Sequence, residues 1–191
     1  MAMAANRSAG LAIETIPHAL LTARDLEGLR ALFDTDYLAD FGAWDPELPY
    51  GYAPHDVHIV ARAGSEIVGH VGWQRRIIGV GGADVVIAGV GGVLVSSGMR
   101  GQGVANRLMT RAATSMTDAG DIEFGYLGCR EDVVPFYESC GWRRISAGER
   151  SFDRGGEPVE QIAGPPILIL PLDPERADWP AGSIDLRGRA W

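Results

Sequence analysis

The pattern of apolar and polar residues in the first half of the chain predicts one helix followed by several strands. From Arg24 to Tyr37, apolar residues recur at helical spacing, with Thr22 in front of them as the expected N-cap. Apolar stretches between turn residues predict strands at 11–16, 57–63, 66–78 and 84–96, the second and third forming a hairpin. Residues 40–56 mix acids and aromatics with proline and glycine, and are expected to form a loop.

The second half alternates helical and extended segments. Helices are predicted at 102–118 and 133–139, and strands at 124–128, 142–145 and 167–170. Residues 155–166 are expected to form a loop and the tail, 173–191, to be irregular. Glycines at 89, 91 and 92 interrupt the strand at 84–96 and indicate a bulge or a close backbone approach. This order of elements favours an α/β fold.

Length and composition favour one folded domain over residues 1–191. The chain has 191 residues, of which 46% are hydrophobic and 22% charged, and no apolar run approaches the ~20 residues that span a bilayer. Residues 1–10 are small and polar, so we expect them to be disordered and not a signal peptide. A cytoplasmic protein is therefore expected, with Cys129 and Cys140 as free thiols and no membrane partner.

The charge balance argues against nucleic acid as a partner. The net charge is −8, with no cluster of lysines or arginines that could form a basic face. A negative surface attracts a cationic ligand by long-range steering, although the same charge also serves solubility.

The segment after the strand at 84–96 is the strongest sign of a ligand site. Gly101 and Gly103 leave backbone N–H groups open to close approach, and the helix that follows adds its unpaired N–H groups and positive dipole end. The loop predicts a seat for a pyrophosphate, and an ordinary glycine turn is the alternative. It lacks both Gly-Lys-Ser/Thr and the three-glycine dinucleotide pattern. The expected binding residues are Val93, Leu94, Val95, Arg100, Gly101, Gln102, Gly103, Val104 and Ala105.

Two motifs resemble one enzyme superfamily. Arg100-x-x-Gly103-x-Ala105 is similar to the signature by which GCN5-related N-acetyltransferases (GNAT) bind acetyl-coenzyme A. Downstream, Phe136-Tyr137-x-x-x-Gly141-Trp142 resembles their Phe-Tyr-x-x-x-Gly-Trp element. The resemblance implies the GNAT fold, a mixed central sheet with splayed strands flanked by helices, in which the pantetheine arm pairs with a bulged strand. It implies acetyl-coenzyme A as cosubstrate.

Three further segments resemble the aminoglycoside 2′-N-acetyltransferases in particular. They are Gln-Arg-Arg at 74–76, Asp-Phe-x-x-x-Asp at 40–45, and Asp-Trp-x-x-Gly at 178–182 with a closing tryptophan at 191. The nodulation N-acyltransferases share the first and the third. The resemblance implies acetylation of the 2′-amine of an aminoglycoside by direct transfer in a ternary complex.

The resemblance also implies a role for single residues. Tyr137 takes the place of the general acid that protonates the leaving thiolate; a packed aromatic is the alternative. The aminoglycoside enzymes carry a glutamate at the position aligned with Gly91, and glycine cannot relay a proton. Asp84, His70 or a water chain ending at a backbone carbonyl could replace it, and the acceptor could be an unusual one, such as kasugamycin.

The acceptor side is expected to hold a cationic aminosugar. Asp40 and Asp45 could bind its amino groups, Trp44 could stack on a sugar face, and Trp191 could fold back over the site. A solvated loop, turn capping, core packing and a frayed terminus are the respective alternatives.

No metal site is expected, since His55 and His58 have only Asp56 beside them and His18 looks exposed. A homodimer fits the resemblance. Two other functions stay open: transfer to another acceptor (a protein N-terminus, a small-molecule amine or a lipo-oligosaccharide) and a non-catalytic acyl-coenzyme A sensor.

Overall fold

One mixed sheet runs through the whole molecule in the computed structural model, which describes residues 10–162, 164–173 and 178–191. Its strands are β1 (Leu11–Pro17), β2 (Val57–Ala63), β3 (Glu66–Val80), β4 (Ala83–Val95), β5 (Phe124–Gly128), β6 (Arg143–Ile145), β7 (Glu149–Phe152), β8 (Pro158–Gln161), β9 (Ile167–Pro171) and β10 (Ile184–Arg189). Their order is β6-β9-β5-β4-β3-β10-β7-β8; in addition, β2 pairs with β3, and β1 pairs with β2.

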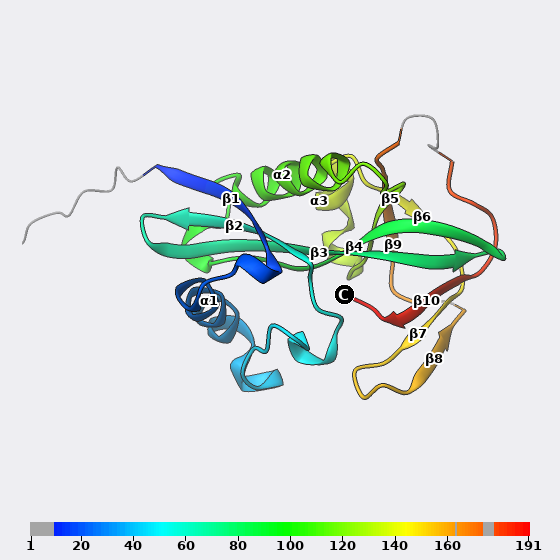
Figure 1. Cartoon of the computed structure of the whole chain (residues 1–191), viewed down its shortest axis with the longest axis horizontal. Coiled ribbons are helices and arrows are strands. Elements are labelled where there is room, and N and C mark those ends of the chain that lie inside the picture. Colours follow the sequence, from blue (N-terminus) through cyan, green and yellow to red (C-terminus); the bar gives the residue numbers. More distant parts are fainter. Residues whose placement is uncertain (1–9, 163, 174–177) are drawn as a thin grey trace, which may run out of the picture.

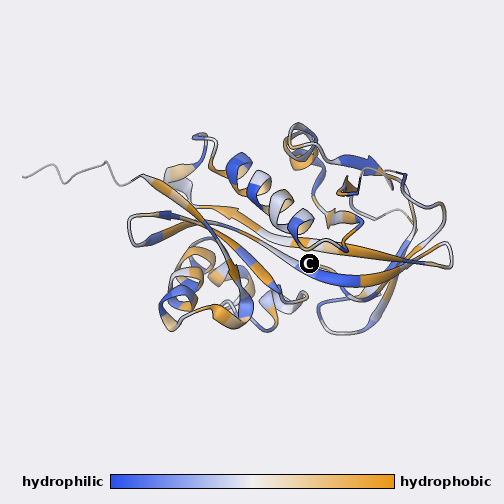
Figure 2. Cartoon of the chain, turned by 45° about the horizontal axis from the view of Figure 1, so that its top comes forward, coloured by the Kyte–Doolittle hydropathy of each residue, from blue (hydrophilic) through white to orange (hydrophobic). Residues whose placement is uncertain are grey.

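Within the described ranges, three α-helices cover the sheet: α1 (Ala23–Phe41), α2 (Val104–Asp118) and α3 (Val134–Ser139). Figure 1 shows α2 and α3 on one side of the sheet and α1 on the other. Orange strand segments lie between the helices in Figure 2, where the apolar side chains form the core. These features match the mixed sheet flanked by helices that the resemblance implies.

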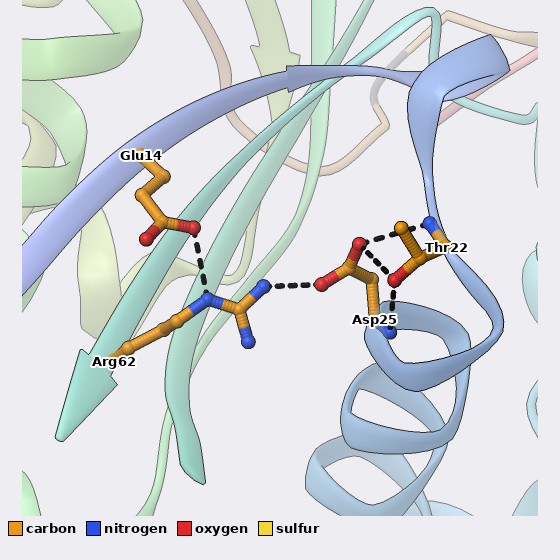
Figure 3. Close-up of polar contacts among 4 residues, drawn as sticks. All are labelled: Glu14, Thr22, Asp25 and Arg62. Carbon is orange, nitrogen blue, oxygen red and sulfur yellow. Dashed lines mark hydrogen bonds and ion pairs between the residues drawn. The ribbon is translucent and has the colours of Figure 1, made fainter. Parts of the chain in front are cut away.

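Helix α1 begins at a capping box that also ties it to the sheet (Figure 3). Thr22 Oγ1 accepts a hydrogen bond from the Asp25 backbone N–H at 3.2 Å, while the Asp25 carboxylate accepts one from the Thr22 N–H at 2.9 Å. Arg62 of β2 donates to Asp25 and to Glu14 of β1. Burial alone would raise the pKa of Asp25, but hydrogen bonds from Thr22 and Arg62 outweigh it and leave the pKa below its ordinary value.

The long strands β3 and β4 lie next to each other in the middle of the sheet. β4 pairs with β3 from Val80↔Ala83 to Gly69↔Val95, but runs parallel to β5 only over Ile87–Gly89. Beyond Gly89 the two parallel strands are no longer paired, which confirms the expected splay.

Three expectations about secondary structure are wrong, and one strand was missed. Helix α1 extends to Phe41, so Asp40 lies on a helix and not in a loop. Strand β8 lies inside the predicted loop at 155–166, β7 was not predicted, and the tail forms β10, which pairs with β3 and with β7. β7 and β8 are four residues long and pair with each other as a hairpin, while β10 depends on partners far away in the sequence. The expected disorder of residues 1–10 falls almost wholly outside the described residues.

Candidate active site

The loop between β4 and α2 has the shape that an anion seat requires. A short helical turn, η3 (Ser97–Met99), follows β4, and Gly101 and Gly103 both adopt a φ of 74°. Gly103 is the N-cap of α2, and in the described chain no side chain caps the helix there. A Cβ added to Gly98, Gly101 or Gly103 would meet no described atom within 4 Å. The first N–H groups of α2 therefore remain open to a ligand.

The polar side chains of this loop hold the loop itself. Arg100 Nε donates to the Val95 carbonyl at 2.9 Å, and an Arg100 terminal nitrogen lies 2.5 Å from Asp36 of α1. Gln102 Nε2 donates to the Gly98 carbonyl at 2.9 Å. Because Arg100 is engaged with the protein, its side chain fixes the loop in place against α1, and the main chain is what the loop offers to a phosphate.

The other expected cofactor residues have apolar side chains, most of them in the core. The side chains of Leu94, Val95 and Val104 are buried in the core, and Ala105 packs against it. Val93 is half-buried and lines a cavity.

Strand β4 carries a bulge shortly before the loop. Gly92 and Val93 together stand opposite the single residue Val71, where the register between β3 and β4 shifts. Gly92 has a φ of 58°, in the left-handed region that favours glycine. The bulge lies beyond the Ile87–Gly89 segment that pairs with β5, so backbone groups of β4 face the opening between the strands.

Tyr137 lies on the α2 side of the sheet, in the same apolar cluster as Val95 and Val104. Its ring packs 5.1 Å from Phe136 and 6.3 Å from Trp142, measured between ring centroids. Burial raises the pKa of its phenol above the usual value, and the neighbouring thiols Cys129 and Cys140 act in the same direction. Tyr137 is therefore a protonated phenol at neutral pH. Both cysteines are free thiols, as expected.

Trp191 lies against β4, with its indole on Gly89 and its main chain on Gly91. A Cβ at Gly89 would stand 2.2 Å from the indole, and one at Gly91 would stand 2.8 Å from the main-chain carbon of Trp191. Arg76 stacks 3.9 Å above the indole, and Trp191 Nε1 donates to Gln74 Oε1 at 3.1 Å. The glycines of β4 thus make room for the docked tail.

Two cavities meet at Trp191 and Tyr52. The smaller one, about 310 Å³, has mostly aromatic walls and reaches the bulge. It is lined by Phe33, Tyr37, Phe41, Trp44, Pro49, Tyr50, Tyr52, Ala53, His55, Gly92, Val93 and Trp191. The larger one, about 460 Å³, lies at the end of β5 and includes Tyr126, Gly128, Cys129 and Glu149.

Part of the expected acceptor site lies elsewhere. Asp40 and Asp45 are exposed and do not appear in the described walls of either cavity. Asp45 Oδ1 accepts the Glu47 N–H at 2.9 Å, so it caps a turn. Trp44 lines the smaller cavity but is only 2% exposed and stacks on Phe33 at 5.2 Å, so its ring belongs to the core.

Neither candidate base stands free beside the bulge. Asp84 lies at the start of β4, where it is paired with Arg187 at 2.5 Å. His70 is fully buried: its Nδ1 lies 2.7 Å from the Gly92 carbonyl and its Nε2 lies 2.9 Å from Nδ1 of His58.

The histidines form a cluster that the sequence analysis missed. His18, expected at the surface, has its Nδ1 3.1 Å from His58 Nε2 and its Nε2 3.0 Å from Glu47. His55 is buried, and its Nε2 has no hydrogen-bond partner among the described residues. Burial and the neighbouring imidazoles lower the pKa of His55, His58 and His70 to about 3. All three are therefore neutral at physiological pH.

Comparison with solved structures defines the fold family. The chain resembles Escherichia coli YhbS, a GNAT family N-acetyltransferase in complex with CoA, at 16% identity and a TM-score of 0.62, over 95% of this chain and 92% of that one. It also resembles a GNAT family acetyltransferase from Brucella melitensis in complex with acetyl-CoA (15% identity, TM-score 0.60, 92% and 95% of the chains). Escherichia coli ElaA aligns at 18% identity with a TM-score of 0.60, over 84% and 99%. The fold is that of the GNAT acyl-CoA N-acyltransferases.

A family model gives a more specific assignment than the fold does. Residues 21–189 match the family model of Nodulation protein A (NodA), and the chain belongs to that family. Fold and family together class it with the N-acyltransferases. No curated protein matches the chain. In the described part of the chain, no helix has the length and apolar character needed to cross a bilayer.

Proposed function

We propose that the chain transfers an acyl group from acyl-coenzyme A, with acetyl-coenzyme A as first candidate, to an amine. The observation that carries this proposal is the segment from the bulge of β4 to Gly103, where α2 begins without a side-chain cap among the described residues. The parting of β4 from β5 leaves main-chain groups for a pantetheine arm, and the first N–H groups of α2 suit a pyrophosphate. Relatives of the same fold carry CoA or acetyl-CoA, which supports the assignment.

Direct transfer assigns a task to Tyr137. The amine nitrogen attacks the thioester carbonyl, the new C–N bond forms, and the C–S bond breaks with its electron pair on sulfur. The phenolic proton of Tyr137 then goes to the thiolate, and burial keeps that proton in place until it is needed. An amine must lose a proton to react, since alkylamines are mostly protonated at pH 7. With Asp84 paired and His70 engaged on both nitrogens, water in the smaller cavity is our candidate to accept it.

An aminosugar is the acceptor class that we propose. Aromatic faces from Tyr50, Tyr52 and Trp191 line the smaller cavity, which suits stacking on a sugar ring, and a net charge of −8 favours a cationic substrate. The 2′-amine of an aminoglycoside, kasugamycin included, is the first candidate. The same cavity fits another acceptor, such as a lipo-oligosaccharide amine.

The proposal is tested with a panel of amines and acyl donors. Aminoglycosides, a chitosan oligosaccharide with a free amine, and peptides with free N-termini are each incubated with acetyl-CoA or a long-chain acyl-CoA, and released CoA is measured. Turnover of an aminosugar supports the proposal. Turnover of peptides alone overturns the acceptor class, and CoA binding with no turnover of any amine overturns the enzyme assignment.

A further inference from the structure

Four histidines far apart in the sequence meet beside the bulge of β4. His55 precedes β2, His58 lies on β2 and His70 on β3, while His18 follows β1. One ring nitrogen from each of the three buried members, His55, His58 and His70, lies within 4.8 Å of the others. The position of Gly72 explains how His55 fits, because a Cβ there would stand 2.3 Å from the His55 ring.

The contacts of this cluster cannot all be hydrogen bonds while every ring is neutral and no further cation is present. The Gly92 carbonyl can only accept, so His70 Nδ1 carries the proton and His70 Nε2 is an acceptor. His58 Nδ1 must then donate to His70, and His18 Nδ1 must donate to His58. That order leaves a lone pair on His18 Nε2 facing the Glu47 carboxylate, unless His18 carries a second proton.

His55 adds a second unsatisfied nitrogen to the same cluster. Its Nε2 is buried and unpartnered in the described chain, and a buried polar atom without a hydrogen bond costs about 1–3 kcal/mol. The same nitrogen lies 3.1 Å from the Cβ position of Gly91, at the cavity beside the bulge.

We propose that His55 Nε2, His58 Nδ1 and His70 Nε2 bind one divalent transition metal ion of the zinc type. The ion takes the place of the proton between His58 and His70. His58 then carries its proton on Nε2 and donates it to His18 Nδ1, and His18 Nε2–H donates to the Glu47 carboxylate. Every imidazole is then neutral with one proton, and both ring nitrogens of His18, His58 and His70 have a partner. The second proton that His18 would need in the metal-free cluster is released to solvent.

The donor set suits this class of metal. Neutral imidazoles bind zinc at about 2.0–2.1 Å, which places two ligand nitrogens of a tetrahedral site about 3.3 Å apart. His58 Nδ1 and His70 Nε2 are 2.9 Å apart, so rings a few tenths of an ångström further apart would hold the ion. The Gly92 carbonyl orients His70, and Glu47 acts through His18 on His58, as supporting hydrogen bonds do at metal-binding histidines. Water from the cavity fills the fourth position.

Cobalt and zinc binding test the site directly. Untagged full-length protein is stripped with a chelator, and Co²⁺ is added while the visible absorption is recorded. We expect one equivalent to bind with the intense bands of a tetrahedral site, and Zn²⁺ to displace it and raise Tm. The matched variants are His55→Gln, which removes a ligand, and His18→Gln, which removes only a supporting contact.

The two variants are expected to give different results. His55→Gln should abolish the tetrahedral spectrum, while His18→Gln should keep it with affinity lowered about 10–100-fold. Circular dichroism shows whether each variant is folded. Folded wild-type protein that binds less than a stoichiometric amount of Co²⁺, or gives only an octahedral spectrum, overturns the proposal without any variant. Unchanged binding by folded His55→Gln also overturns it. Neither result bears on the acyltransferase proposal, which the amine panel tests.

Discussion

Replacement of Tyr137 by phenylalanine separates chemistry from packing. Phenylalanine keeps the ring that packs on Phe136 and Trp142 and removes only the phenolic oxygen. The side chain is 8% exposed, so the loss of one hydrogen-bonding group is expected to change the free energy of unfolding by about 1 kcal/mol.

The effect on turnover should be much larger. A positioned general acid contributes about 10²- to 10⁴-fold, which corresponds to about 3–5 kcal/mol of barrier. We therefore expect kcat to fall at least 100-fold with Tm nearly unchanged and with CoA affinity retained. A rise in the activation barrier that is larger than the loss in unfolding free energy would identify the phenol as the acid, because a change in packing alone cannot produce that difference.

The assay is steady-state release of CoA, with calorimetry of CoA binding and a thermal melt on the same preparation. Phe136→Leu is the matched control, since it perturbs the neighbouring ring and leaves the phenol in place. A Tyr137→Phe enzyme that keeps more than a tenth of wild-type kcat, with unchanged stability, would refute the role of the phenol as acid.

Three other predictions follow from the same geometry. Gly103→Ala, at a φ of 74° with no described atom within 4 Å of the new Cβ, should cost about 1–2 kcal/mol of stability and weaken CoA binding at least tenfold by calorimetry. Gly89→Ala should displace Trp191, whose indole lies 2.2 Å from the new Cβ, at a cost of about 1–3 kcal/mol, seen as a moved indole N–H signal in NMR. Asp25→Asn should lower the free energy of unfolding at pH 7, as measured by urea unfolding. Because the pKa of Asp25 is lower in the folded protein than its unfolded value of about 3.9, the stability difference between wild type and variant should be fully present above about pH 3.9 and should disappear as the pH falls through the folded pKa.

Local signals in the sequence predicted the elements that position the cofactor side. The Thr22 cap, the apolar spacing of α1, the hairpin around 63–65 and the glycine loop are each decided by neighbours in the chain. The bulge could be predicted because glycines at 89, 91 and 92 are unusual in a strand. The structure gives their separate uses: Gly89 and Gly91 admit Trp191, and Gly92 adopts the bulge conformation.

The acceptor side could not be predicted in the same way, because its contacts join distant segments. β10 pairs with strands that lie about 35 and 105 residues earlier, and its own sequence, with arginines and a glycine, has little strand character. The histidine cluster was missed for the same reason. The sequence shows His55 and His58 as a pair, and only the pairing of β2 with β3 places His70 beside them.

Whether the start of α2 binds coenzyme A is measured by calorimetric titration of coenzyme A into the folded chain, with wild-type and Gly103→Ala protein side by side. We expect saturable heat for one site in the wild-type protein and an affinity at least tenfold lower in the variant. A folded wild-type protein that gives no heat with coenzyme A, or a variant that binds as tightly as wild type, would contradict it.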